Sequence, residues 1–274
     1  MEQKKVLRKG IRGKKMRVED LFECTGKIAL VTGGSKGLGK AMAEALVAAG
    51  ATVVITSRKY EELILVKKEF LEKYQDAKVH IYEFDHSNWK DSNKLIDLIE
   101  KEVGEIEILV NNAGTGLVSE IEKMTDDQWQ YIMDLNLSSH MALSRRVISN
   151  MVRKQWGRII NTASLFGMCV LENRTAYCSS KGAVIQFTKA LAIEAAQYSP
   201  NITVNCISCG PMRTPLMKES WNNIEKRKFY DELTALKRWG EPKDIMGAVL
   251  LLASNAGSYI TGHNLFIDGG ASAK

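Results

Sequence analysis

The stretch Ala29-Leu-Val-Thr-Gly-Gly-Ser-Lys-Gly-Leu-Gly-Lys-Ala-Met-Ala43 joins a short apolar run to a helix-period run through a glycine-rich turn. Gly33, Gly37 and Gly39 permit positive φ angles and a close approach of backbone to a ligand. The helix that follows offers free N–H groups and a positive dipole end to an anion. A strand, a glycine turn and a helix in this order predict a dinucleotide-binding βαβ unit. The spacing Thr-Gly-x-x-x-Gly-x-Gly departs from the more familiar Gly-x-Gly-x-x-Gly.

The rest of the chain alternates short β-branched runs with longer helix-period runs, which is typical of a parallel sheet covered by helices on both faces. We expect strands near residues 27–32, 52–57, 78–84, 108–111, 157–162, 203–207 and 264–267. Helices are expected near residues 37–49, 61–73, 89–103, 126–154, 175–198 and 242–254. The sequence therefore predicts an α/β protein with a single doubly wound Rossmann-type domain and a seven-stranded parallel sheet.

Length and composition suit one large domain, with 274 residues of which 45% are hydrophobic. No apolar run is long enough for a membrane span or a secretory signal, so we expect a soluble cytoplasmic protein that does not bind membranes. The net charge of +6 comes from a Lys- and Arg-rich beginning. We predict a flexible basic arm over residues 1–20, followed by the domain over residues 21–274. A nucleic-acid, anionic-surface or transit role for the arm is disfavoured against a solvated tail.

The end of the second predicted strand discriminates between cofactors. NAD sites place an Asp or Glu there for the ribose hydroxyls, but this chain has Ser57, Arg58 and Lys59. Arg58 can form a forked contact with a 2′-phosphate, and Lys36 adds a second positive charge. NADP is therefore predicted over NAD, and the alternative is that both cations are solvated surface residues.

A candidate catalytic group follows from Tyr177 and Lys181, which share one helical face at positions i and i+4. A neighbouring ammonium group would lower the pKa of the phenol and make it usable in acid–base catalysis. Ser164 ends the strand before this helix, where its hydroxyl could hold a substrate carbonyl. Asn136 lies within a predicted helix, a poor position for asparagine unless its amide or a distorted carbonyl is used.

At this point the chain resembles the short-chain dehydrogenase/reductase family, from about residue 21 to the C-terminus. The matching motifs are Thr32-Gly-Gly-Ser-Lys-Gly-Leu-Gly39, Asn111-Asn-Ala-Gly114, Asn136, Ser164, Tyr177-Cys-Ser-Ser-Lys181, Cys209-Gly-Pro-Met-Arg-Thr214 and Asp268-Gly-Gly270. The resemblance implies that Tyr177 exchanges the proton, Lys181 lowers its pKa and holds the nicotinamide ribose, Ser164 orients the carbonyl, and Asn136 supports a water in a proton relay. The residues expected to bind the cofactor are Thr32, Gly33, Ser35, Lys36, Gly37, Leu38, Gly39, Ser57, Arg58, Asp85, His86, Asn112, Ala113, Gly114, Tyr177, Lys181, Gly210, Met212 and Thr214.

Two cysteines fall in one of these motifs. Cys206-x-x-Cys209 could indicate a metal or redox site, but no second Cys or His pair has ligand spacing, so we expect no metal. Cys209 also stands where the family usually has proline before a glycine, which predicts a less stiff loop.

The substrate is expected to be a small molecule held by Ser164, Arg174 and Tyr177. The chain looks nearest to the gluconate 5-dehydrogenase branch, which implies a sugar acid of the gluconate/5-ketogluconate type. Arg174 or Arg213 could bind its carboxylate, although a structural or cofactor contact is favoured for either arginine. Alternatives are a 3-oxoacyl thioester reductase and a non-catalytic NADP-binding sensor.

Two further expectations concern coverage and assembly. The insertion near residues 214–240 interrupts the alternation and is predicted to cover the substrate as a lid. The competing interpretation is a plain surface or oligomer-contact helix pair. The resemblance also implies a homotetramer, formed through the helices at residues 126–154 and 175–198 and the C-terminal region.

Overall fold

The computed structural model describes residues 17–274, and the predicted basic arm lies outside the described residues as far as residue 16. Seven parallel strands form one sheet in the order β3-β2-β1-β4-β5-β6-β7. The strands are β1 (Ile28–Thr32), β2 (Thr52–Ser57), β3 (Lys78–Glu83), β4 (Ile108–Asn111), β5 (Gly157–Thr162), β6 (Ile202–Cys209) and β7 (Asn264–Ile267). The order reverses between β1 and β4, which is where such sheets bind ligands. The predicted doubly wound fold is confirmed.

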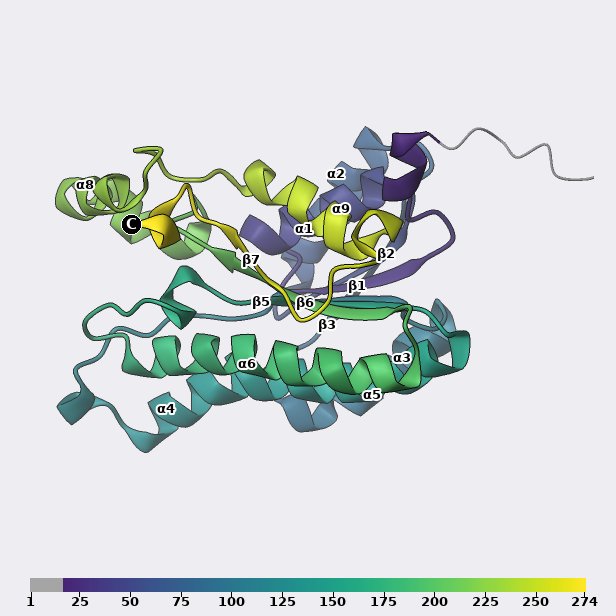
Figure 1. Cartoon of the computed structure of the whole chain (residues 1–274), viewed down its shortest axis with the longest axis horizontal. Coiled ribbons are helices and arrows are strands. Elements are labelled where there is room, and N and C mark those ends of the chain that lie inside the picture. The colour runs from purple at the N-terminus through teal and green to yellow at the C-terminus, as the bar shows by residue number, and fades with distance from the viewer. Residues whose placement is uncertain (1–16) are drawn as a thin grey trace, which may run out of the picture.

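Helices cover both faces of the sheet (Figure 1). One layer holds α1 (Gly37–Ala48), α2 (Tyr60–Lys73) and α9 (Met246–Ala253), and the other holds α3 (Ser92–Glu102), α5 (Ser139–Lys154) and α6 (Thr175–Tyr198). Separate apolar clusters fill the two sides of the sheet. Short 3-10 turns occur at Val18–Phe22, Trp89–Asp91, Ile121–Lys123, Leu165–Gly167, Pro215–Met217, Pro242–Ile245, Asn255–Gly257 and Ala271–Ala273. Within residues 17–274, no helix combines the length and apolarity needed to cross a bilayer.

The single helix predicted over residues 126–154 is divided. α4 (Asp126–Met133) is capped by Thr125, whose hydroxyl accepts a 3.2 Å bond from the Gln128 backbone N–H. A π-helical turn, Asp134–Ser138, separates α4 from α5. Such bulges change which side chains face inward, and they occur mostly at functional sites. The turn buries Asn136 completely, so the misplaced asparagine in the sequence marks this irregularity.

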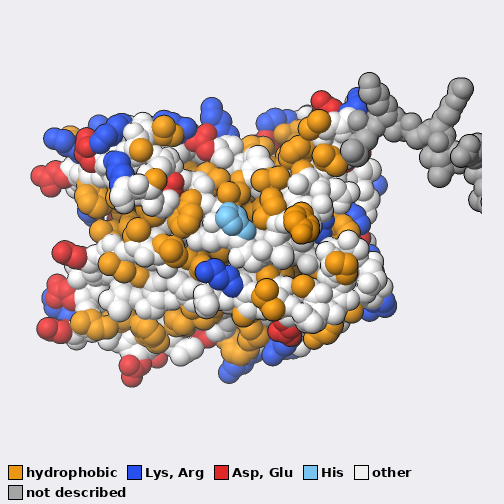
Figure 2. Space-filling model, viewed as in Figure 1, with side chains coloured by type: hydrophobic (Ala, Val, Ile, Leu, Met, Phe, Trp, Pro, Cys, Tyr) orange, Lys and Arg blue, Asp and Glu red, His pale blue; other side chains and the backbone are white. Residues whose placement is uncertain are grey.

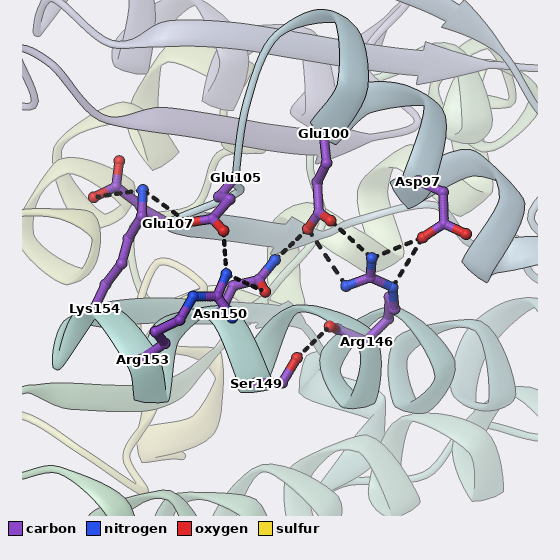
Figure 3. A network of polar contacts seen from close by, with 9 residues as sticks. All are labelled: Asp97, Glu100, Glu105, Glu107, Arg146, Ser149, Asn150, Arg153 and Lys154. Carbon is purple, nitrogen blue, oxygen red and sulfur yellow. Dashed lines mark hydrogen bonds and ion pairs between the residues drawn. The ribbon is translucent and has the colours of Figure 1, made fainter.

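Charged side chains join α3 to α5 along their exposed edge (Figure 3). Arg146 donates from one Nη2 to Asp97 Oδ1 at 2.7 Å and to Glu100 Oε2 at 2.7 Å. Two turns further on, Arg153 pairs with Glu105, which follows the end of α3. These contacts hold α5 in register against α3, and α5 continues directly from the turn that carries Asn136.

The insertion after β6 is closed at its base. Gly240 donates to the Pro211 carbonyl at 2.9 Å and accepts from the Arg213 backbone N–H at 2.8 Å. Beyond this base lie α7 (Lys218–Asn222) and α8 (Ile224–Leu233), at the end of the sheet where β6 finishes (Figure 1). Trp239 makes edge-to-face contacts with Trp221 and Tyr230. β6 itself runs two residues beyond the predicted strand because it pairs with β7 as far as Cys209.

Candidate active site

The turn between β1 and α1 forms a cradle for an anion. Gly33 has φ +66°, and a Cβ placed on Gly39 would lie only 2.2 Å from the Gly33 carbonyl oxygen, so both positions require glycine. The N-cap residue, Lys36, makes no side-chain capping bond. The first N–H groups of α1 therefore stay available for a phosphate. Thr214 reaches this turn, because a Cβ on Gly37 would lie 3.4 Å from its Cβ.

Thr32 ties the cradle to the segment after β4. Its hydroxyl oxygen accepts bonds from the backbone N–H groups of Asn112 (2.9 Å) and Ala113 (2.8 Å). The Asn112 side chain donates to the Thr32 carbonyl at 2.9 Å. The predicted cofactor residues at the ends of β1 and β4 thus form one surface at the switch point of the sheet.

Three of the predicted cofactor residues, Arg58, Asp85 and His86, follow the ends of β2 and β3. Arg58 donates to the Tyr131 hydroxyl at 3.2 Å. Asp85 accepts from the Ser87 backbone N–H at 2.9 Å. His86 is fully buried and lies 2.8 Å from the Thr56 hydroxyl, and this burial lowers its pKa to about 4. His86 therefore supports this wall of the site as a neutral group.

Glu62, on the first turn of α2, was not predicted as part of the site. Its carboxylate accepts a 2.9 Å hydrogen bond from Ser35, and Lys36 lies 3.4 Å away. Burial acts to raise the pKa of Glu62, but the Ser35 hydrogen bond and the Lys36 charge lower it overall. Glu62 is therefore an ionised group among the predicted cofactor residues. We considered only the residues directly after the second strand as sources of a carboxylate, and Glu62 was missed because it lies in the helix that follows.

Ser164, Tyr177 and Lys181 come together at the ends of β5 and α6. Ser164 lies beside Tyr177, and its hydroxyl oxygen accepts from the Phe166 backbone N–H at 3.1 Å. Burial raises the pKa of Tyr177, although the nearby Ser164 side chain and the Arg174 charge act in the opposite direction. This differs from the prediction that Lys181 lowers it. The Lys181 ammonium donates instead to the Thr162 carbonyl at 2.7 Å, and burial lowers the pKa of Lys181 to about 8.

Asn136 faces this group from the π-helical turn. Its amide bonds the Thr115 backbone at both ends, accepting from the N–H at 2.9 Å and donating to the carbonyl at 2.9 Å. It also donates to the Ser180 hydroxyl at 3.0 Å. A Cβ on Gly114 would lie 3.1 Å from Asn136 Oδ1 and 3.5 Å from Lys181 Nζ, which shows how close these side chains come. Thr115 and Ser180 were not predicted. Ser180 stands within the Tyr-Cys-Ser-Ser-Lys motif, which was its only signal.

Arg174 lies at the mouth of the site, just before α6. A Cβ on Gly116 would lie 3.1 Å from its Nη1 and 3.9 Å from a ring carbon of Tyr177. Its charge also acts on Tyr230 of the insertion. Among the described residues, no carboxylate pairs with Arg174. Arg213, the other candidate, stacks 4.3 Å above Trp221 and lies 3.6 Å from Glu241. The sequence left open which of the two arginines could bind a substrate carboxylate. In the structure Arg213 is engaged by Trp221 and Glu241, whereas Arg174 has no carboxylate partner among the described residues.

The loop after β6 completes the surface. Gly210 donates to the Ile267 carbonyl at 3.0 Å, and Met212 pairs with Gly240 across a β-bridge. Cys206 contacts the Asn264 side-chain oxygen at 3.4 Å, and burial raises the pKa of Cys209 to about 12. Both thiols are therefore buried and protonated at neutral pH. No cluster of potential metal ligands occurs in the described part of the chain.

Comparisons with known proteins agree with this geometry. A family sequence model described as enoyl-(acyl carrier protein) reductase matches residues 33–272. An NAD-dependent glycerol dehydrogenase of Listeria innocua is 34% identical over 92% of this chain and 96% of its own length. A 3-oxoacyl-(acyl-carrier-protein) reductase of Aquifex aeolicus is 34% identical over 89% and 97%. A gluconate 5-dehydrogenase structure from Burkholderia cenocepacia, in complex with NADP and tartrate, superposes with a TM-score of 0.88 at 30% identity, covering 94% of this chain and 100% of that one.

The chain belongs to the short-chain dehydrogenase/reductase family, and it is an oxidoreductase. The relatives differ from one another in substrate and in cofactor, so family membership by itself leaves both open.

Proposed function

We propose that this protein transfers hydride reversibly between NADP(H) and the carbon of a secondary alcohol or ketone, with Tyr177 exchanging the alcohol proton. The observation that carries the proposal is that Ser164 lies close enough to Tyr177 to act on its pKa, with Lys181 and Asn136 gathered around Gly114. A proton donor and a second hydroxyl next to each other can both bond one carbonyl oxygen. A non-catalytic sensor would not need this pair, so catalysis is favoured over the sensor alternative.

Each residue has a defined task in the proposed reaction. Ser164 donates a hydrogen bond to the substrate oxygen and orients it toward Tyr177. The raised pKa of Tyr177 keeps the phenol protonated at neutral pH, so in ketone reduction it gives its proton to the forming alkoxide. Lys181 would hold the nicotinamide ribose and replace the proton, with a water held near Asn136 as the next member of the relay. The cofactor, when bound, supplies or accepts the hydride.

NADP is proposed as the preferred cofactor because the adenosine end of the site is rich in cations. Arg58 lies at the surface and donates one hydrogen bond to Tyr131, and Lys36 is the N-cap residue at the anion cradle but makes no side-chain capping bond. No carboxylate follows β2 directly. The NADP in the Burkholderia cenocepacia relative supports this choice, while the NAD-dependent Listeria innocua relative keeps NAD as the alternative.

A sugar acid of the gluconate/5-ketogluconate type is proposed as substrate because Arg174 presents a cation beside Tyr177 with no carboxylate partner among the described residues. An unpaired guanidinium is suited to forked binding of a carboxylate. The alternative, reduction of a 3-oxoacyl thioester, is supported by the Aquifex aeolicus relative. Residues 214–240 are proposed as the cover of this substrate, because Tyr230 lies within reach of the Arg174 charge.

We also propose a homotetramer, with the exposed apolar side chains of the described residues as its contact face. Figure 2 shows charged side chains mostly at the left end and along the edges of this view, while hydrophobic and white atoms fill most of the middle, around Lys or Arg and His side chains. Large apolar side chains are also exposed on α6, where Ile193 is 67% exposed, and at Tyr259 before β7. Light scattering tests the assembly, because a mass near the 30.6 kDa of one chain contradicts a tetramer.

The direct test of the substrate class compares 5-ketogluconate with an acetoacetyl thioester, each with NADPH and with NADH. We expect faster turnover of the sugar acid, with NADPH preferred. Faster turnover of the thioester contradicts the proposed substrate and supports the alternative. Cofactor binding without turnover of any ketone contradicts catalysis altogether.

A further inference from the structure

The Glu62 carboxylate is the centre of a small polar cluster at the end of β2. Ser35 donates to Glu62 at 2.9 Å and also lies 3.0 Å from the Ser57 hydroxyl. Lys36 and Lys59 approach the other carboxylate oxygen at 3.4 and 3.6 Å. Ser35, Lys36 and Ser57 are three of the residues predicted to bind the cofactor. Their polar atoms are therefore already gathered around an anion that the protein itself supplies.

We propose that Glu62 determines cofactor specificity: its carboxylate occupies the position of a 2′-phosphate, opposes NADP, and accepts a hydrogen bond from the ribose 2′-hydroxyl of NAD. The proposal rests on the proposed function, because it assumes that a nicotinamide dinucleotide binds at this turn. It makes the proposed preference for NADP over NAD a modest one, so that the protein uses both dinucleotides.

The electrostatic argument concerns a phosphate entering beside a carboxylate. A phosphomonoester carries a charge of about −1.5 to −2 near neutral pH, and it needs the donors that Glu62 now holds. Binding NADP must displace the carboxylate or place two anions together, and either costs affinity. Arg58, Lys36 and Lys59 supply the compensating positive charge, so NADP binding is reduced and not abolished. The ribose of NAD carries no such charge and can donate to the carboxylate directly.

The position of Glu62 in the chain is consistent with this role. NAD-binding sheets place an acidic residue about twenty residues beyond the glycine turn to bond the ribose 2′-hydroxyl. Here the end of β2 lacks that residue, and α2 returns a carboxylate to the same place from its first turn. An acidic residue in the first turn also stabilises a helix through its dipole. A control must therefore separate a helix effect from a cofactor effect.

Glu61 provides that control, because it lies in the same first turn of α2 but is exposed and contacts no cation among the described residues. Glu62→Gln keeps the size of the side chain and removes its charge. Glu61→Gln removes the same charge one residue away. Both variants change the helix–dipole interaction similarly, whereas only Glu62→Gln frees Ser35 and Lys36.

The test measures dissociation constants of NADPH and NADH by nucleotide fluorescence without any substrate. For the wild type we expect the two constants to lie within about tenfold of each other, which is the range of a partly exposed charge interaction. Glu62→Gln should tighten NADPH binding by about five- to tenfold and weaken NADH binding by about threefold. Glu61→Gln should change their ratio by less than about twofold.

The proposal is overturned if Glu62→Gln and Glu61→Gln have the same ratio of NADPH to NADH dissociation constants. A wild type that prefers NADPH by more than about a hundredfold overturns it without any variant. The binding measurement needs no ketone, so it tests Glu62 separately from catalysis. If Glu62→Gln shifts the two dissociation constants as expected but the protein reduces no ketone, the role of Glu62 is supported and the proposed reaction is contradicted. Absence of binding by either dinucleotide would overturn both.

Discussion

The ammonium group of Lys181 donates a 2.7 Å hydrogen bond to the backbone carbonyl of Thr162, at the last residue of β5. Lys181 is only 3% exposed, and no carboxylate among the described residues forms an ion pair with it. A buried cation held only by a neutral acceptor is costly for the folded state. The site therefore keeps a proton-transfer group at the expense of stability.

We predict that Lys181→Met abolishes most activity. It should also make the free energy of unfolding depend less on pH in the alkaline range. Burial lowers the pKa of Lys181 from 10.5 to about 8, so between these values the unfolded wild type binds more protons and its folded state gains stability as pH rises. The wild type should gain about 3 kcal/mol relative to Lys181→Met between pH 7.5 and 10.5. Urea unfolding at both pH values measures this. Lys189→Met, an exposed change on the same helix, should show no such gain.

Substitution of Arg174 should separate carboxylated from uncharged substrates. Arg174→Met is expected to raise the KM for a sugar acid by about 10- to 100-fold, which corresponds to loss of one charged hydrogen bond. The KM for an uncharged ketone should change much less. Arg213→Met is the matched control, because Arg213 is engaged with Trp221 and Glu241. An equal effect of Arg174→Met on both substrate classes would rule out carboxylate recognition by this residue.

Arg146 should contribute measurably to stability because it bonds two carboxylates of α3. Arg146→Met is expected to lower the free energy of unfolding by about 1–2 kcal/mol, and less in 1 M salt. Arg145→Met is the control, because Arg145 is an exposed neighbour without a carboxylate partner among the described residues. This change should alter the free energy of unfolding by less than about 0.5 kcal/mol. Equal effects of the two changes would contradict a specific role for the network.

Acid should destabilise the protein through its buried histidines. Burial lowers the pKa of His86 to about 4 and holds that of His140 well below its usual value. An unfolded histidine has a pKa of about 6.5 and binds a proton first, so stability should fall as pH decreases from 6.5 toward 4. His86→Gln should reduce this slope by up to about 1.4 kcal/mol per pH unit. The exposed His263 supplies the matched control, because His263→Gln removes an imidazole that is not buried.

The sequence predicts the sheet well because β-branched runs and glycine turns are local signals. It predicts one helix over residues 126–154 because the apolar period continues through the π-helical turn. Asn136 was the visible exception, and its burial against Thr115 and Ser180 gives the physical reason.

Glu62 and the free state of Arg174 could not be predicted in the same way. Glu62 meets Ser35 only because α2 folds back over the glycine turn. Whether an arginine is paired or free depends on carboxylates far away in the chain, as Arg213 with Glu241 shows. The pKa of Tyr177 also differed from expectation, since the spacing of Tyr177 and Lys181 indicates their shared face but not the burial that raises it.

The most direct test of the proposed chemistry measures Tyr177→Phe in two assays, NADPH binding by fluorescence and ketone reduction by absorbance. The change removes only the phenolic hydroxyl beside Ser164. We expect the dissociation constant for NADPH to stay within about threefold of the wild-type value, while kcat falls by about a thousandfold or more. A Tyr177→Phe protein that reduces the same ketone at the wild-type rate would contradict the assignment of Tyr177 as the proton-transfer residue.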